Sequence, residues 1–398
     1  MAPQSSLLAA AALNAVVALT MAAVLVLPVM APAVAADTGL PTSLLGAYSF
    51  LMWTAALAAS SGVGKLIGRF GAVRLAQTSL GLCSVAVACG ATGLTAALVA
   101  MPALIGIACA LETPASSDIL ARVTPPASRT FIFSLKQTGV QTGGMLAGLL
   151  FPAALPVLGW RGAMAALAVL LLAGAVVLEP MHRRLEARAP TVRPPGGGPT
   201  GFSYILRTRT LRDLATASFV FHAMQVCLNT FLVAYLVGEH DYSLAAAGLL
   251  LTIAQFGGFV GRLGFGFLLG PRLAVIRLLA GIGLGMTAAA LGVGLAAGDL
   301  PKSGLALLCF AFGLTASGWN GVFLAEVARQ APPGEIARVT GGAMVSAYAG
   351  LILGPVAFSV AAASAATLGA GYLLLAGATL AGTIVLHRHR DDPPPRAV

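Results

Sequence analysis

Charged residues are scarce in this sequence and make up only 9% of its 398 residues. A soluble globular domain carries about a quarter charged residues, so this chain cannot cover a water-facing surface. Its hydrophobic fraction of 58% and its mean hydropathy of +0.92 indicate that lipid is the solvent. Membrane-spanning strands would alternate polar and apolar residues, whereas the apolar runs here are long and continuous. The composition therefore predicts an all-α membrane protein and excludes a soluble enzyme.

Signatures of catalysis and of metal binding are also missing. The five cysteines lie within apolar runs, and no pair of them has the spacing of a zinc site. The sequence has no phosphate-binding loop with Lys-Ser or Lys-Thr, so it carries no motif for using ATP. We therefore expect no metal, no cofactor and no enzymatic activity. The net charge of +10 would suit a nucleic-acid partner, but the placement of the basic residues favours another explanation.

Twelve apolar runs are long enough to cross a bilayer as helices, which takes about 20 residues each. We expect these spans at residues 7–33, 42–63, 73–92, 96–120, 130–155, 162–180, 213–237, 244–268, 273–296, 303–327, 338–361 and 365–386. The predicted organisation is an N-terminal six-helix bundle at 1–180, a cytoplasmic linker at 181–212, a C-terminal six-helix bundle at 213–386 and a cytoplasmic tail at 387–398.

Basic residues gather on one side of this layout. If the N-terminus is cytoplasmic, 20 of the 23 Lys and Arg lie in the inner loops, the linker and the tail. Arg161 and Lys302 face the other side, and Lys136 lies within a span. This asymmetry follows the positive-inside rule and explains the net charge without nucleic acid. We expect a monomer in a bacterial inner membrane, with both termini in the cytoplasm.

The two halves of the sequence repeat one another. The stretch Ala121-Arg122-x-x-Pro125-Pro126 returns as Ala328-Arg329-x-x-Pro332-Pro333, and Thr142-Gly143-Gly144 returns as Thr340-Gly341-Gly342. A duplicated hydrophobic half is typical of transporters built from two bundles around a central site. Because each half has an even number of spans, the two repeats are inserted in parallel.

The loop between the second and third spans carries the most specific motif. It reads Gly64-Lys65-Leu66-Ile67-Gly68-Arg69-Phe70-Gly71-Ala72-Val73-Arg74. With the twelve spans, the duplication and the basic linker, it resembles the major facilitator superfamily, whose loop usually reads G-x-L-x-D-R-x-G-R-R. The resemblance implies that spans one, four, seven and ten line a cavity. Gly68 stands where the family has Asp, which implies a different or weaker cytoplasmic latch.

A bacterial subgroup near the cyanate-permease-like branch shares further stretches with this sequence. They are Thr113-Pro114-Ala115-Ser116-Ser117, Ser134-Leu135-Lys136-Gln137-Thr138-Gly139, Gly159-Trp160-Arg161 and Gly318-Trp319-Asn320-Gly321. The chain is similar to that branch in these stretches alone.

Ionisable side chains within spans are candidates for function because charge inside a membrane is costly. Lys136, with Gln137 and Gln141 at nearby positions of its helix, is a candidate for binding a carboxylate. The alternative is a structural salt bridge from Lys136 to Glu112 or Asp118. Glu112, near the middle of its span, is the first candidate for proton coupling, and its alternative role is a fixed partner of Lys136.

The seventh span carries a polar stripe of Ser218, His222, Gln225 and Asn229, spaced to share one helical face. Such a stripe faces either another helix or water, and we expect the cavity. His222 is a second candidate for proton coupling, and the alternative is a hydrogen-bonded packing residue. Asn14 in the first span and Trp319 and Asn320 in the tenth would complete the set of substrate-binding residues.

Acidic residues near the inner ends of the fourth and tenth spans suggest a gate. Asp118 and Glu326 are expected to pair with Arg69, Arg262 or Arg272 across the halves and to close the cytoplasmic mouth. Breaking such pairs would open that mouth in a two-state switch. The alternative for both acids is an ordinary solvated helix end.

The sequence as a whole predicts a secondary active transporter that works by alternating access. Its substrate is expected to be a small organic anion or metabolite, because Lys136 is the one basic side chain placed deep in the membrane, and protons are the expected coupling ion. Symport and antiport both stay open. The alternatives are an antiporter that exports drugs or lipophilic cations, with Glu112 as the cation contact, and a membrane sensor that binds a solute without moving it.

Overall fold

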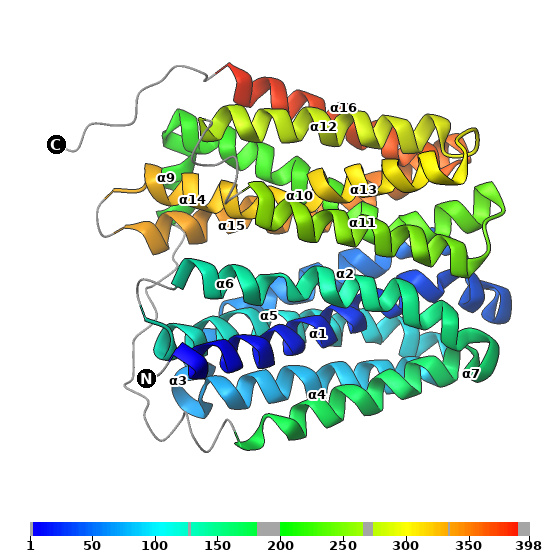
Figure 1. The fold of residues 1–398 in the computed structure, drawn as a ribbon, viewed down its shortest axis with the longest axis horizontal. Helices are drawn as coiled ribbons and strands as arrows, with labels where there is room; N and C mark the ends of the chain where they lie inside the picture. The colour runs from blue at the N-terminus through cyan, green and yellow to red at the C-terminus, as the bar shows by residue number, and fades with distance from the viewer. Residues whose placement is uncertain (1–2, 126–128, 181–199, 266–273, 333–334, 389–398) are drawn as a thin grey trace. The chain divides into compact units, whose positions relative to one another are not determined.

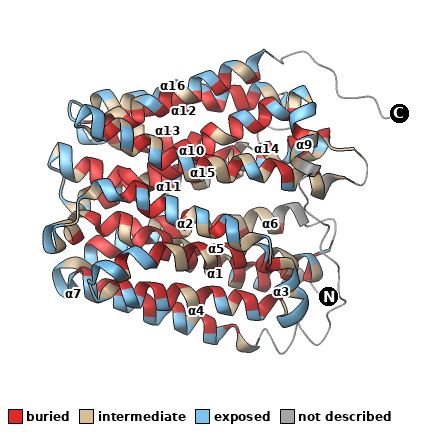
Figure 2. Ribbon diagram, turned by 180° about the vertical axis from the view of Figure 1, so that it is seen from behind, coloured by how far each residue is buried: buried red, intermediate tan, exposed pale blue. Residues whose placement is uncertain are grey.

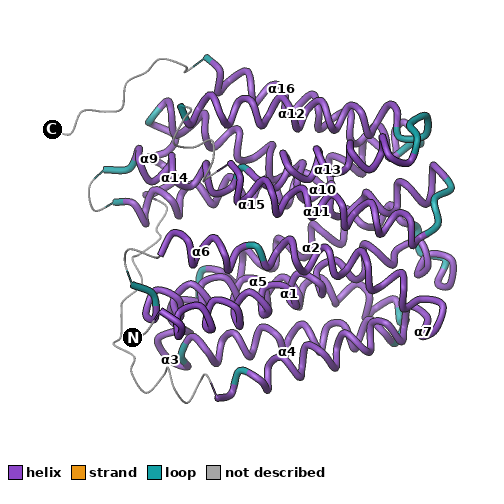
Figure 3. Tube along the Cα trace, viewed as in Figure 1, coloured by secondary structure: helices purple, strands orange, loops and turns teal. Residues whose placement is uncertain are grey.

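The computed structural model describes residues 3–125, 129–180, 200–265, 274–332 and 335–388. Every regular element in these ranges is a helix (Figures 1 and 3). The helices are α1 (Pro3–Thr38), η1 (Thr42–Leu44), α2 (Leu45–Ser60), α3 (Val63–Phe70), α4 (Ala72–Ala91), α5 (Thr95–Val123), α6 (Arg129–Gln137), α7 (Gly139–Val177), α9 (Thr200–Arg207), α10 (Arg209–His240), α11 (Leu244–Gly264), α12 (Val275–Ala296), α13 (Lys302–Gly318), α14 (Asn320–Gln330), α15 (Ile336–Ala365) and α16 (Leu368–His387).

Eleven helical segments of the described chain are long and apolar enough to cross a membrane. One of them, Ile132–Val177, has 46 residues, which is about twice the length that a span needs. Gly159 interrupts it with a φ of 64°, a left-handed conformation that glycine adopts without strain. The segment therefore holds two of the expected spans, 130–155 and 162–180, and the prediction of twelve membrane helices is confirmed.

Contacts between helices divide the chain into two compact units. The first unit contains α1 to α7 and the beginning of α11 as far as Thr252. The second contains α9, α10, the rest of α11 from Ile253, and α12 to α16. Most of the expected linker at 181–212 and almost all of the expected tail at 387–398 lie outside the described residues, so the domain boundaries stay a prediction.

The duplication seen in the sequence extends to the helices. α5 runs from Thr95 to Val123, and the pair α13–α14 runs from Lys302 to Gln330, an offset of 207 residues at both ends. Helix pairs also recur: α1 packs on α7 and α4 on α5 in the first unit, as α10 packs on α15 and α12 on α13 in the second.

Two glycines hold equivalent helix pairs close together. A Cβ added to Gly139 of α7 would stand 2.5 Å from the carbonyl oxygen of Asn14 on α1. A Cβ added to Gly350 of α15 would collide with the carbonyl oxygen of Phe219 on α10. Because only glycine leaves room for such an approach, the two contacts are small-residue membrane packing between equivalent helix pairs.

Buried residues fill the inside of each unit, and exposed apolar residues cover much of the remaining helix surface (Figure 2). α10 is the most enclosed candidate span, with 94% of its most apolar window buried, against 33% for the segment that contains α2. The polar stripe of α10 therefore does not face lipid.

Candidate functional site

A buried pair of opposite charges lies inside the first unit. Glu112 Oε1 of α5 and Lys136 Nζ of α6 are 3.8 Å apart, and the two side chains are 6% and 1% exposed. This distance exceeds that of a hydrogen bond. Neither atom has a hydrogen-bond partner within the described part of the chain. The other carboxylate oxygen, Oε2, accepts a hydrogen bond of 2.9 Å from Thr113 Oγ1. Coulomb attraction alone therefore joins Glu112 to Lys136.

Lys136 stands beside an interruption of its span. Thr138 separates α6 from α7, although its φ of −65° and ψ of −16° are helical. Asn14 of α1 reaches this junction, where its Nδ2 donates to the carbonyl oxygen of Leu135 at 2.8 Å and to Thr138 Oγ1 at 3.0 Å. The carbonyl oxygen of Lys136 lies 3.4 Å from the same nitrogen. In this geometry the Asn14 amide positions the backbone around Lys136.

The two glutamines that follow Lys136 are in different surroundings. Gln137 is half-buried and closes α6, whereas Gln141 is completely buried within α7. Neither atom of the Gln141 amide has a hydrogen-bond partner among the described residues. A buried amide without partners is rare in native proteins and marks a place for a polar ligand or water. Thr138 between them keeps helical dihedrals, so Lys136 and Gln141 lie on one nearly continuous helical segment.

The polar stripe of α10 lies inside the second unit and is bonded to neighbouring helices. His222 Nδ1 is 2.9 Å from the carbonyl oxygen of Ser218, a contact that puts the ring proton on Nδ1. Gln225 Nε2 donates to Ser317 Oγ at 3.4 Å. Asn229 Oδ1 accepts a bond of 2.7 Å from Gln255 Nε2 of α11. The stripe is a neutral polar seam in which every member has a protein partner.

The expected residues of the tenth span join this seam. Trp319 separates α13 from α14 but has helical dihedrals, as Thr138 does between α6 and α7. Asn320 Nδ2 donates to Gln225 Oε1 at 3.3 Å. The Trp319 ring is fully buried and meets His222 edge to face, with 4.7 Å between ring centroids. The structure thus brings together His222, Gln225, Trp319 and Asn320, and their role in binding substrate stays a prediction.

The acids of the expected gate pair with arginines of their own helices. Asp118 Oδ2 is 2.6 Å from Arg122 Nη2. Glu326 is fully buried and accepts bonds of 2.8 and 2.5 Å from Arg329. Arg122 and Arg329 are the duplicated arginines, so the same ion pair recurs in both repeats. The pairing of these acids across the halves stays a prediction.

The remaining gate residues have no such partners. Arg69 is exposed and stacks on the ring of Phe70 at 5.2 Å. Arg262 is half-buried, and its Nε has no hydrogen-bond partner in the described ranges. Arg272 lies outside the described residues.

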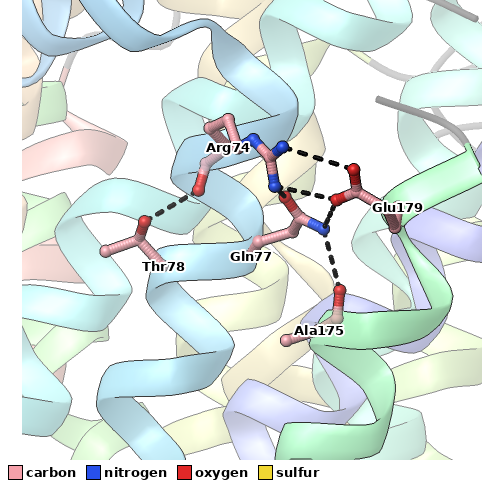
Figure 4. A network of polar contacts seen from close by, with 5 residues as sticks. All are labelled: Arg74, Gln77, Thr78, Ala175 and Glu179. Carbon is pink, nitrogen blue, oxygen red and sulfur yellow. Dashed lines mark hydrogen bonds and ion pairs between the residues drawn. The ribbon is translucent and has the colours of Figure 1, made fainter. Parts of the chain in front are cut away.

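Arg74, the last residue of the motif between the second and third spans, anchors a polar network in the first unit (Figure 4). Its guanidinium makes two bonds to Glu179, of 2.8 and 3.3 Å. Gln77 Nε2 joins them, donating to Glu179 Oε2 at 3.1 Å and to the carbonyl oxygen of Ala175 at 3.0 Å. The network ties the beginning of α4 to the residues that follow α7.

Sequence analysis missed three polar residues that the structure adds to these clusters. They are Thr113, which bonds Glu112, and Gln255 and Ser317, which bond the α10 stripe. A polar residue within an apolar run was the available signal for all three, but its partner depends on packing between helices. The one-residue interruptions at Thr138 and Trp319 were missed as well, although each adjoins a glycine, Gly139 or Gly318, which is a known sign of irregular helix.

Two curated relatives match part of the chain. They are uncharacterized MFS-type transporters from the CDC 1551 / Oshkosh and ATCC 25618 / H37Rv strains of Mycobacterium tuberculosis, and each is 29% identical over 173 residues. The match spans 39% of this chain and 35% of each relative, so the chain covers about a third of the length of these relatives.

Solved structures resemble the chain over nearly its whole length. One is a crystal structure of a bacterial homolog to the human lysosomal transporter Spinster in an inward-facing and occupied conformation, with a TM-score of 0.73 at 16% identity. The unoccupied inward-facing form gives a TM-score of 0.70 at 18% identity. Both comparisons cover 98% of this chain and 96% of the other, and at such identities they show the fold alone.

A family description covers more of the sequence than the curated relatives do. The description of the Major Facilitator Superfamily matches residues 12–355. This range includes the ionisable candidates of the spans, Glu112, Asp118, Lys136, His222 and Glu326. The long apolar helices, the duplicated packing and this match agree, and the chain therefore belongs to the Major Facilitator Superfamily, a family of multi-pass membrane transporters.

Proposed function

We propose that the chain is a secondary active transporter that moves a small organic anion across the membrane by alternating access, with protons as the coupling ion. The observation that carries this proposal is the Lys136 ammonium, buried at 1% exposure and without a hydrogen bond from the described residues. A buried ammonium is costly unless it is both paired and hydrogen-bonded. Its incomplete surroundings suit a ligand that supplies the missing acceptors.

A carboxylate fits this requirement best among simple ligand groups. Its oxygens would accept charge-assisted bonds of about 2.7–2.9 Å from an ammonium, considerably closer than Glu112 comes. A phosphate could supply acceptors too, but its second charge would need a second cation. In the described part of the first unit, the other basic side chains lie near helix ends or beside the Gly159 kink.

Glu112 is our candidate for the proton carrier. Its Oε1 accepts no hydrogen bond from the described residues and faces Lys136, so a proton can be added there without displacing a bond. His222 is the second candidate, because Nδ1 donates to the carbonyl oxygen of Ser218 and Nε2 is the ring nitrogen that can accept a proton. Thr113 would keep holding Oε2 in either protonation state, since a hydroxyl can donate or accept.

The rival function is efflux of a lipophilic cation that binds Glu112. The Oε1 atom of Glu112, which accepts no hydrogen bond from the described residues, favours this rival function. A cation could bind this oxygen where a proton binds in our proposal. Lys136 opposes it, because an ammonium 3.8 Å from that oxygen would repel a second cation. We therefore favour the anion.

Further parts of the proposal come from the sequence. They are placement in a bacterial inner membrane with both termini in the cytoplasm, kinship with the cyanate-permease-like branch, a monomeric state, and a cytoplasmic gate formed by Arg69, Asp118, Arg262, Arg272 and Glu326. The asymmetry of the basic residues supports the orientation. Labelling the termini with an impermeant reagent on intact cells tests it.

Thermal stability of the purified protein with small carboxylates tests the anion site, because specific binding stabilises by mass action. Lys136→Gln is the test variant, and Lys302→Gln, which changes an exposed lysine, is the matched control. We expect wild type and the control to be stabilised by the same carboxylates and Lys136→Gln by none. Equal stabilisation of Lys136→Gln would remove the proposed anion site. Stabilisation by tetraphenylphosphonium that depends on Glu112 would support efflux instead.

A further inference from the structure

We propose that the site takes monoanions, and that each crosses the membrane with one proton bound to Glu112, so that the transport cycle moves no net charge. This inference rests on the proposed function and adds to it the charge of the substrate and the stoichiometry. Both follow from the charge balance around the buried pair.

The buried site carries a net charge of zero before anything binds. Lys136 supplies one positive charge and Glu112 one negative charge, and both side chains are almost completely enclosed. A monoanion alone would leave one unpaired negative charge in surroundings of low dielectric constant, which is strongly unfavourable. A proton on Glu112 restores the balance. A dianion would leave one negative charge even then, and a zwitterion would need no proton.

Other ionisable groups around Glu112 do not change this balance. Cys109 of the same helix and Cys83 of α4 lie close enough to interact with the carboxylate, and both are neutral as thiols. Tyr48 of α2 donates its hydroxyl to the carbonyl oxygen of Val24. Among the charged residues of the packed helices whose side chains are described, Asp37 pairs with Arg161, Asp118 with Arg122 and Arg74 with Glu179. Lys65 and Arg69 are exposed near a helix end.

The exchange of partners needs no hydrogen bond to break. A proton from the aqueous phase binds Oε1 of Glu112, and the carboxylate becomes a carboxylic acid. Lys136 keeps its own proton and passes from Glu112 to the carboxylate of the substrate. The separation of 3.8 Å makes this step easy, because attraction at that distance lacks the directional bond of a close ion pair. Release of the anion and the proton restores the starting pair.

Binding measurements at several pH values test the coupling. The probes are lactate, gluconate and benzoate as monoanions, succinate as a dianion and alanine as a zwitterion, and thermal stabilisation of the purified protein reports affinity. One proton taken up per anion requires the affinity for a monoanion to fall about tenfold per pH unit, in the range where Glu112 carries its charge in the free protein. Affinity for succinate should be lower than that for the best monoanion at every pH.

Glu112→Gln separates this inference from the proposed function. The variant keeps the ammonium but has no charge for a proton to neutralise, so it should bind the same monoanion without the pH slope. Glu179→Gln, which changes a half-exposed carboxylate outside the site, should keep the slope of the wild type. A slope retained in Glu112→Gln, or stabilisation by succinate alone, overturns the inference while leaving the anion site. Absence of stabilisation by every carboxylate probe overturns the anion site itself.

Flux through reconstituted vesicles tests the prediction of no net charge movement. Uptake of labelled probe, the monoanion that binds best, should follow a pH gradient that is alkaline inside. An electrical potential imposed with potassium and valinomycin should leave the rate unchanged. A rate that follows the potential contradicts the charge balance.

Discussion

The Glu112–Lys136 pair makes a quantitative prediction about stability without any ligand. Replacing either residue alone leaves the other as an uncompensated charge in a site where the side chains are 6% and 1% exposed. At 3.8 Å and an effective dielectric constant of about 20, the attraction that is lost is roughly 4 kcal/mol. Breaking a buried pair from one side typically costs about 3–5 kcal/mol.

The double variant should cost less than the sum of the two single variants. Glu112→Gln and Lys136→Gln together remove both charges and leave two neutral amides of similar size. The coupling energy between the two positions should then exceed about 2 kcal/mol, as expected for residues in direct contact. The Arg74–Glu179 pair is the control, because side chains that are 46% and 32% exposed should couple by less than about 1 kcal/mol.

Thermal unfolding in detergent, without added carboxylate, measures this cycle. For units of about 200 residues, each kcal/mol shifts the midpoint by roughly 2–4 °C, so each single variant should fall by roughly 6–20 °C. The double variant should recover a clear part of that loss. If the two single losses simply add, the charges do not depend on each other, and the argument for an exchange of partners at Lys136 fails.

Three smaller predictions concern the packing and polar contacts around this site, and each is measured by the same thermal unfolding. Asn14→Ala should lower the free energy of unfolding by about 1–3 kcal/mol, because the acceptors at the α6–α7 junction lose their donor. It should also weaken carboxylate binding, which a purely structural role would not do. Gly139→Ala should cost about 1–3 kcal/mol by overpacking against α1, whereas Gly81→Ala, with open space around its Cβ, should be neutral or slightly stabilising. Glu179→Gln should change stability by less than about 1 kcal/mol, with an effect that shrinks as salt rises.

Hydropathy made the spans predictable, because in lipid each helix must form its own backbone hydrogen bonds and expose apolar side chains. The same reasoning brought Glu112 and Lys136 together, since the short connection between their spans placed the two charges at similar depth. Depth alone left both Glu112 and Asp118 as possible partners of Lys136, and in the structure Glu112 lies 3.8 Å from it. Asp118 was the other candidate, and it pairs with Arg122 one turn away.

Side-chain hydrogen bonds were much less predictable. Asn14 was expected to contact substrate, yet its amide reaches three atoms at the α6–α7 junction. An asparagine in an apolar run shows that a polar partner exists, but the partner depends on helix rotation and on local breaks in the backbone. At the junction of α6 and α7 these acceptors are the carbonyl oxygens of Leu135 and Lys136 and the hydroxyl of Thr138.

The two repeats share their helix packing but differ in the residues buried at equivalent positions. The spacing of 207 residues that relates Arg122 to Arg329 also relates Glu112 to Trp319, so a buried indole stands in one repeat where the other has the carboxylate. The first unit thus holds the buried charge pair, whereas the seam of the second unit is neutral. Because the Glu112–Lys136 pair has no counterpart at the equivalent position of the second repeat, a single proton balances a single anion. Trp319→Glu, which places a carboxylate at the equivalent position, should therefore add a second pH-dependent group, and a pH slope of binding identical to that of the wild type would contradict this assignment.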